Sequence, residues 1–191
     1  KLVGYSGLTP RVEQSGESKG CIRIQFDHFP NQQVQPSLII VEDNGIGMSE
    51  EKMYQVLQSI GSSEKMDHIL RGEKGIGILS FASIANEVHI CSHNAQAGPT
   101  SCLVLKREWL RDGLAQVVPS CSQHPLIKHG TKAYLMGVLP EVAQQLTRTR
   151  LRQYLSREFA TDLRRNLYTL HIGDKHSYES VEPRQFRGIP L

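Results

Sequence analysis

The sequence predicts an α/β fold of two layers, in which a mixed sheet carries helices on one face. Three observations support this fold class. Short stretches of alternating or continuous apolar residues are typical of strands, and longer stretches with apolar residues at helical spacing are typical of helices. The two kinds follow one another as loop, two strands, helix, glycine-rich loop, helix, four strands, helices and hairpin. With 191 residues, the chain is long enough for one domain with a sizeable core.

Two strands and a helix follow a polar stretch, residues 1–20, that reads as a loop. Apolar and polar residues alternate in Cys21–Asp27, which is the pattern of a half-buried strand. Leu38–Val41 is an unbroken apolar run and suits a central strand. Ser49 is placed to cap the next helix, because a serine oxygen accepts a hydrogen bond from the free N–H groups of a first turn. The apolar residues of that helix recur at helical spacing: Met53, Val56, Leu57 and Ile60.

The middle of the chain is predicted to consist mostly of strands. Gly61–Gly77 is polar and rich in glycine, and a loop of that length inside a compact domain is usually functional or disordered. A short apolar helix is expected at Ile78–Ala85. Four strands are then expected, at Glu87–Cys91, Ser101–Lys106, Ala115–Val118 and Thr131–Val138.

The last part of the chain changes character after Pro140, a favourable first residue of a helix. The expected elements are a helix over Glu141–Asn166, broken near Thr147–Thr149, and a hairpin of Leu167–Ile172 with Ser177–Val181. We therefore divide the chain into residues 1–139, which hold the main domain, and residues 140–191. The second part is interpreted as a helical connector and the start of a second, truncated unit.

Composition narrows the classes of protein. The net charge is +3, from 22 basic and 19 acidic residues, which is too mild to indicate nucleic-acid binding by itself. No apolar run approaches the roughly 20 residues that span a bilayer, so no membrane segment is expected. The four cysteines are widely spaced without a Cys-x-x-Cys pair, which disfavours a disulfide framework and a zinc site. We expect them to be reduced, and the protein to be cytoplasmic.

Arginine-rich helices near the end of the chain are the other feature that could indicate nucleic acid. Six arginines fall within residues 148–165. Glu158 and Asp162 are interleaved with them, and this mixture favours a solvated helix face over a nucleic-acid patch. Nucleic acid therefore stays an open but unsupported partner.

A first glycine cluster, Asp43-Asn44-Gly45-Ile46-Gly47-Met48, follows the apolar strand. An aspartate held at a strand end accepts hydrogen bonds and cannot donate them, so it suits a donor such as the exocyclic amine of adenine. Glycines beside it let the backbone approach a flat ligand. The same residues also fit an ordinary Asp-Asn-Gly turn, and the cluster alone does not separate the two interpretations.

A second cluster, Gly72-Glu73-Lys74-Gly75-Ile76-Gly77-Ile78-Leu79-Ser80, leads into the predicted second helix. Glycines at a helix start expose N–H groups at the positive end of the helix dipole, and such groups bind phosphate. The cluster is not a Walker A loop, because the Gly-Lys-Ser/Thr ending is missing. It is not a dinucleotide fingerprint either, since no strand directly precedes it. A flexible glycine-rich connector is the remaining alternative.

The two clusters in this order, with Ile60-Gly61-Ser62-Ser63-Glu64-Lys65 between them and His129-Gly130-Thr131 before a later strand, resemble the GHKL (Bergerat-fold) ATPases. That superfamily includes DNA gyrase B, the ninety-kilodalton heat-shock chaperones, MutL, microrchidia proteins and sensor histidine kinases. The resemblance covers about residues 21–138 and implies a two-layer Bergerat sandwich with a mostly antiparallel sheet. It is nearest the chaperone, MutL and microrchidia branch, because the phenylalanine-containing box of the kinases is not visible.

The resemblance implies a role for each motif residue. Asp43 would accept the adenine amino proton, Gly45 and Gly47 would give the base room, and Met48 would line the adenine site. Thr131 would reach the adenine side through its hydroxyl. The phosphates and the lid would involve Ser62, Ser63, Lys65, Lys74, Gly75, Ile76 and Gly77, with the backbone amides of the last three holding the phosphates. The side chain of Lys74 could equally point to solvent.

The family also carries, on a helix before the first strand pair, a glutamate that activates water and an asparagine that holds magnesium. No such helix is visible after Lys1, so we expect the Mg²⁺ ligand and the catalytic base outside this chain. Glu13 and Glu17 lie in a Gly/Ser-rich stretch and are not assigned as bases, and Asn44 is not assigned as the metal ligand.

The function implied is ATP binding within a GHKL-type ATPase, a chaperone-like hydrolase in which nucleotide closes a lid and changes conformation or association. The expected cofactors are ATP and Mg²⁺. The expected partners are ATP and ADP, and a second copy or another protein in nucleotide-dependent association. Two alternatives stay open: an interaction module gated by nucleotide without turnover, and the catalytic domain of a sensor histidine kinase.

Overall fold

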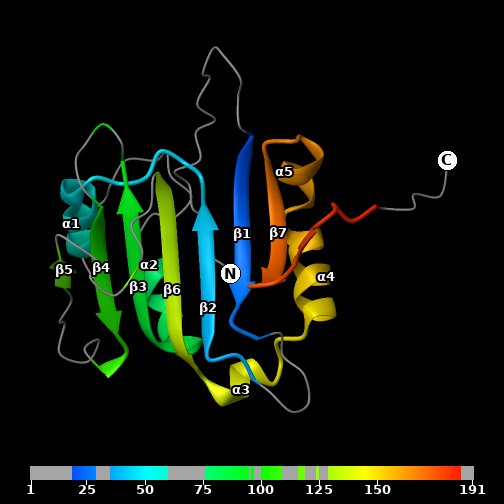
Figure 1. Ribbon diagram of the computed structural model, residues 1–191, viewed down its shortest axis with the longest axis horizontal. Coiled ribbons are helices and arrows are strands. Elements are labelled where there is room, and N and C mark those ends of the chain that lie inside the picture. Colours follow the sequence, from blue (N-terminus) through cyan, green and yellow to red (C-terminus); the bar gives the residue numbers. More distant parts are fainter. Residues whose placement is uncertain are drawn as a thin grey trace.

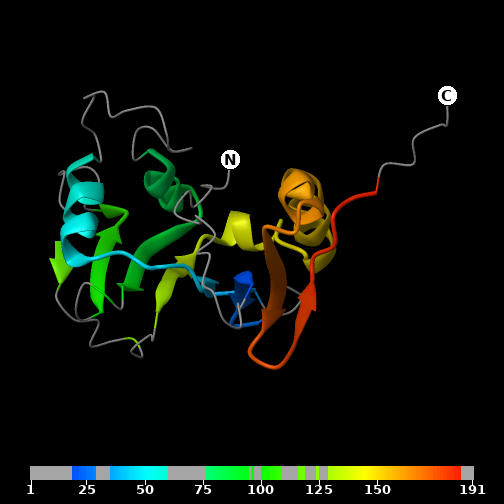
Figure 2. The ribbon, with the colours of Figure 1, turned by 90° about the horizontal axis from the view of Figure 1, so that it is seen from above.

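The computed structural model describes residues 19–28, 35–59, 76–94, 96, 100–108, 116–118, 124 and 129–185. Within these residues an eight-stranded sheet runs through the molecule in the order β5-β4-β3-β6-β2-β1-β7-β8 (Figure 1). The helices gather on one face of this sheet (Figure 2). The predicted α/β sandwich with helices on one face is therefore confirmed.

The strands of the sheet are mostly antiparallel, as expected. Their bounds are β1 (Gly20–Phe26), β2 (Leu38–Asp43), β3 (Ala85–His93), β4 (Ser101–Lys106), β5 (Gln116–Val118), β6 (Gly130–Val138), β7 (Tyr168–Asp174) and β8 (Tyr178–Ser180). β2 pairs antiparallel with both β1 and β6, and β3 pairs antiparallel with both β6 and β4. The exception is β7, which runs parallel to β1.

Alternation along the central strands divides their side chains between the two faces of the sheet. On the helix-covered face, strand pairing aligns apolar residues into rows across β2, β6 and β3: Ile39 with Leu135 and Val88, then Val41 with Ala133 and Ile90. These rows pack against Met53 of α1 (Glu50–Ser59) and against Phe81, and Met53 is fully buried. The core of this half of the molecule therefore lies between the sheet and α1.

The short helix expected at Ile78–Ala85 differs in the structure. Helix α2 (Ile76–Leu79) passes into a 3₁₀ turn, Ser80–Ser83, and β3 already begins at Ala85. Ala85 is fully buried and pairs with Val138 of β6. Ala85 therefore belongs to the sheet, although the local pattern predicts it as part of the helix.

The long helix expected at Glu141–Asn166 consists of three pieces: α3 (Pro140–Ala143), α4 (Arg148–Glu158) and α5 (Ala160–Arg164). The break near Thr147 was expected, and there the Thr147 side chain accepts a hydrogen bond from the N–H of Arg150 and caps α4. The second break was not. Phe159 leaves helical geometry, with φ −100° and ψ 13°, and packs against the apolar cluster around Leu155 and Leu170.

Residues on both sides of the proposed division at residue 139 share this sheet. β7 pairs with β1 over its whole length, and Ile172 and Leu170 of β7 lie in one apolar cluster with Ile24 and Phe26 of β1. Helix α4 covers that cluster through Leu155. Whether residues 140–191 also begin a second unit stays a prediction.

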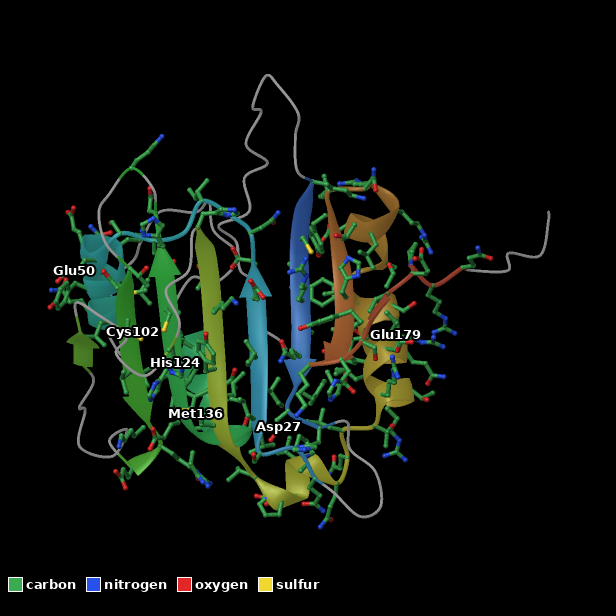
Figure 3. All side chains as sticks on the ribbon, in the orientation of Figure 1. Asp27, Glu50, Cys102, His124, Met136 and Glu179 are labelled. Atoms are coloured by element: carbon green, nitrogen blue, oxygen red, sulfur yellow. The ribbon has the colours of Figure 1, made fainter. Side chains whose placement is uncertain are left out.

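The other face of the sheet, turned to the viewer in Figure 3, carries Cys102, His124 and Met136 near β4, β3 and β6. Cys102 is disulfide-bonded, so the expectation that all four cysteines are reduced is wrong for this residue. Cys91 is free and fully buried, and burial raises the pKa of its thiol to about 12. None of the described helices is long and apolar enough to cross a membrane.

Candidate nucleotide-binding site

The residues of the first predicted motif lie at one edge of the sheet, at the top in Figure 1. There β2 ends at Asp43 and β3 ends at His93, while β6 begins at Gly130. The segment after β2 passes over this edge towards α1 (Figure 1). Three strand ends and one connecting segment therefore meet at the place where the sequence puts the adenine base.

Asp43 is a half-buried acceptor at this edge. Its Oδ1 accepts a hydrogen bond of 2.8 Å from the N–H of Gly45, which holds the carboxylate in a fixed orientation. Burial raises the pKa of Asp43, and the backbone N–H groups of Gly45 and Thr131 oppose this effect only in part. A carboxylate that is poorly hydrated and fixed in place suits one directed donor, such as the exocyclic amine of a base.

Asn44, the next residue, extends the pairing of β1 with β2 through its side chain. Its Oδ1 accepts a bond of 2.6 Å from the N–H of Cys21, and its Nδ2 donates to the carbonyl oxygen of Lys19 at 3.1 Å. Both polar ends of the amide are thus engaged with the start of β1. That Asn44 is not the metal ligand stays a prediction.

Two glycines let the segments at this edge approach one another more closely than any other residue would allow. Gly47 has φ +71°, and a Cβ atom there would lie 2.0 Å from the carbonyl oxygen of His93. Gly130 has φ +88°, and a Cβ atom there would lie 2.2 Å from the carbonyl oxygen of Asp43. The first contact joins the motif to β3 and the second joins it to β6. Gly47 was predicted from the sequence, whereas Gly130 was noted there only as part of the later motif.

Thr131 lies directly opposite Asp43, because the two residues are paired between β6 and β2. Residues opposite each other on one face of an antiparallel pair have Cβ atoms about 5 Å apart. The structure therefore places on neighbouring strands the carboxylate and the hydroxyl that the family resemblance assigns to adenine. Thr131 is buried, and its Oγ1 lies 2.9 Å from Oγ of Ser92.

Ser92 of β3 was missed from the sequence. It has no exposed surface, and its Oγ accepts a bond of 2.7 Å from the N–H of Met48. The side chain of Met48 is half-buried and packs against the cluster that contains Met53 and Phe81. The only local signal for Ser92 was a polar residue at an inward position of β3, two residues after Ile90.

Seven residues are assigned to the phosphates and to the lid. Ser62, Ser63, Lys65, Lys74 and Gly75 lie outside the described residues. The backbone of the remaining two is described, and both stand in the first turn of α2: Ile76 and Gly77. Their position at a helix start is the one expected of phosphate-binding amides, and the assignment itself stays a prediction.

A second polar cluster lies on the face of the sheet opposite the helices, and two of its members, His89 and Tyr134, are buried. Nδ1 of His89 lies 2.9 Å from Nε2 of His124, and the ring of His124 stacks on Tyr134 with centroids 3.8 Å apart. Burial, together with the charge of His89, lowers the pKa of His124. Among the residues that the structure describes, no group of three or more His, Cys, Asp or Glu is placed to hold a metal ion.

Known proteins similar to this chain include bacterial chaperones named HtpG. That of Orientia tsutsugamushi (strain Boryong) is 32% identical over 92 residues, which make up 42% of this chain and 14% of the chaperone. That of Rickettsia canadensis (strain McKiel) is 30% identical over 120 residues, 56% of this chain and 17% of the chaperone. That of Rickettsia typhi (strain ATCC VR-144 / Wilmington) is 29% identical over 133 residues, which make up 63% of this chain and 19% of the chaperone. The chain thus covers less than a fifth of the length of these relatives.

A family model covers more than half of the chain. Residues 16–131 match the family described as histidine kinase-, DNA gyrase B-, and HSP90-like ATPase. This range contains the edge at which Asp43, Gly47, Ser92 and Thr131 meet. The chain belongs to this family and is a GHKL-type ATP-binding domain.

Proposed function

We propose that this chain is the nucleotide-binding part of an ATPase in which bound ATP closes a lid and alters association with a partner. The observation that carries the proposal is the pairing of Asp43 with Thr131. A half-buried carboxylate with a raised pKa faces the same edge as a hydroxyl on the next strand. This arrangement favours a flat ligand with an amine at its rim, and adenine has that chemistry.

The residues present fit the base better than they fit the metal. Asp43 and Thr131 supply acceptors for the adenine rim, and Gly47 removes a side chain that would keep the loop away from β3. In our proposal the amides of Gly75, Ile76 and Gly77 bind the phosphates, with charge added by Lys65 and Lys74. Mg²⁺ would neutralise the phosphates and lower the barrier to attack on the last of them. No described residue is assigned to it.

The lid and its consequences rest on the sequence and on similarity. Ser62 and Ser63 would begin a segment that folds over the nucleotide and extends to Lys74. The similarity to chaperones named HtpG favours an ATPase of that branch over a sensor kinase. In such a protein the nucleotide would change the association of the parent protein with a second copy or with another protein.

Calorimetric titration with ATP tests the assignment of Asp43. The Asp43→Asn variant keeps the shape of the side chain and removes its charge. Its ATP affinity should fall roughly tenfold or more, because a hydrogen bond to a charged acceptor contributes about 1.5–3 kcal/mol. Glu42→Gln is the matched control: Glu42 is the preceding residue of β2 and pairs with Lys132 at 3.1 Å on the opposite face. Equal ATP affinity in the parent chain and in a folded Asp43→Asn variant would contradict the proposal.

A further inference from the structure

A row of polar residues crosses three strands immediately above the apolar core. Strand pairing places Asp43 of β2 opposite Thr131 of β6, and Thr131 opposite Ser92 of β3. Two residues away on each strand, towards the core, the corresponding row is apolar: Val41, Ala133 and Ile90. Ser92 therefore occupies a position at which the pattern of β3 predicts an apolar side chain. A buried hydroxyl at such a position is costly unless it is fully hydrogen-bonded.

The Ser92 hydroxyl makes three contacts, and their donors and acceptors can be assigned. Oγ of Ser92 lies 2.7 Å from N of Met48, 3.1 Å from O of Gly130 and 2.9 Å from Oγ1 of Thr131. A backbone N–H can only donate, so Met48 donates to Ser92. A backbone carbonyl can only accept, so the single proton of Ser92 goes to Gly130. Since the proton of Ser92 is thereby used, the Thr131 hydroxyl must donate to Ser92.

This assignment fixes what Thr131 can offer to a ligand. Its only proton points to Ser92, so its oxygen presents lone pairs and acts as an acceptor. Asp43, beside it, is also an acceptor when ionised. Two adjacent acceptors match an amino group and repel a carbonyl oxygen. In purine nucleotides, adenine carries an amine at the position where hypoxanthine and guanine carry a carbonyl.

We propose that Ser92 is a positioning residue that holds the Thr131 hydroxyl as an acceptor, and that this makes the site select a 6-aminopurine over a 6-oxopurine. The inference rests on the proposed function, because it assumes that the base binds at Asp43 and Thr131. Ser92 itself touches no nucleotide. It acts through Thr131 and through the N–H of Met48, and so joins the motif after β2 to the start of β6.

The test compares the affinities of ATP and ITP, which differ at this amine or carbonyl, in the parent chain and in Ser92→Ala. Without Ser92 the Thr131 hydroxyl can rotate and donate to the carbonyl of ITP. The ratio of ATP to ITP affinity should therefore fall about fivefold, the size of one neutral hydrogen bond gained or lost. If the role of Ser92 is purely structural, Ser92→Ala will weaken the binding of ATP and of ITP equally. The ratio of the two affinities will then be unchanged, and that result would overturn the inference.

A second substitution shows whether the effect passes through Thr131. Thr131→Val removes the hydroxyl and keeps the shape. In the Thr131→Val background, Ser92→Ala should no longer change the ratio of ATP to ITP affinity, whereas an undiminished change would contradict transmission through Thr131. If Ser92→Ala does not fold, Ser92→Cys replaces it in the comparison. The thiol is a weaker donor and acceptor than the hydroxyl, so the ratio should fall by less, and an unchanged ratio would again overturn the inference.

The two proposals fail in different ways. If the proposed function is wrong, the parent chain will not bind ATP, or its binding will not depend on Asp43. If only the present inference is wrong, ATP will bind and Asp43→Asn will weaken it, while Ser92→Ala leaves the preference for ATP over ITP unchanged.

Discussion

A Cβ atom on Gly47 would lie 2.0 Å from the carbonyl oxygen of His93, so the segment after β2 rests on the end of β3 only because residue 47 has no side chain. Its φ of +71° is also in the left-handed region, which costs other residues about 1–2 kcal/mol. Both effects act at the place where the motif residues approach β3. Gly47 is therefore required for the shape of this edge of the sheet.

Gly47→Ala should lose more stability than Gly137→Ala, which is its matched control. Gly137 has a similar φ of +64°, but a Cβ there would meet the side chain of Asn86 at 2.9 Å, and a side chain can move aside. The backbone strain is common to both variants, so the difference isolates the clash with His93. Denaturant unfolding measures the free energy of unfolding of each variant. Equal losses in the two variants would mean that the segment after β2 shifts away from His93 without cost. ATP affinity should fall only in Gly47→Ala.

Asn44→Ala should destabilise the chain by about 1–3 kcal/mol, because it leaves the N–H of Cys21 and the carbonyl of Lys19 without their side-chain partner. Since both ends of the Asn44 amide are used at the start of β1, any loss of ATP affinity should be the same with and without Mg²⁺. Calorimetry in magnesium and in chelator checks this expectation. A loss confined to the magnesium titration would identify Asn44 as a metal ligand instead.

Local pattern was sufficient for β1, β2 and α1. The alternation in Cys21–Asp27 corresponds to β1, and the apolar run Leu38–Val41 lies within β2. The spacing of Met53, Val56 and Leu57 corresponds to α1, whose Met53 is fully buried. Each of these signals depends on residues close together in the sequence, which is why they could be interpreted without a structure.

Contacts between distant residues could not be predicted in this way. The parallel pairing of β7 with β1 joins Tyr168 to Gly20, and nothing near either residue specifies the partner. Asp43 was predicted because it lies in a motif with glycines. Ser92 was not, because its partners Met48 and Thr131 are 44 and 39 residues away in the sequence. Its role depends on the register of three strands, which is a property of the fold.

The segment Gly61–Lys74 is the predicted lid and lies outside the described residues. Its sequence is polar apart from Met66, Ile69 and Leu70, so little apolar burial is expected to oppose its opening. Hydrogen exchange in this segment should be fast without nucleotide and slower with a non-hydrolysable ATP analogue. In Asp43→Asn the analogue should give little protection at the same concentration. Equal protection with and without nucleotide would argue against a lid.

The raised pKa of Asp43 predicts how stability and binding change with pH. Burial favours the protonated form in the folded chain, so the folded pKa lies above the unfolded value of about 3.9. The contribution of Asp43 to stability is then fully present below that unfolded value. It is lost as the pH rises through the folded pKa and the carboxylate ionises.

The free energy of unfolding of Asp43→Asn, minus that of the parent chain, should therefore increase from acid towards neutral pH and then level off. Taking this difference cancels the titration of every other group whose environment the substitution leaves unchanged.

Nucleotide binding should show the opposite dependence on pH, because the ionised carboxylate of Asp43 is the acceptor for the amine. The advantage of the parent chain over Asp43→Asn in ATP affinity should shrink as the pH falls through the folded pKa, and the titration of ATP itself cancels in that ratio. Denaturant unfolding and calorimetry between about pH 3.5 and 7.5 test both expectations. If the stability difference is flat across this range, Asp43 is as well hydrated in the folded chain as in the unfolded one, and a poorly hydrated acceptor for adenine is then the wrong description of this site.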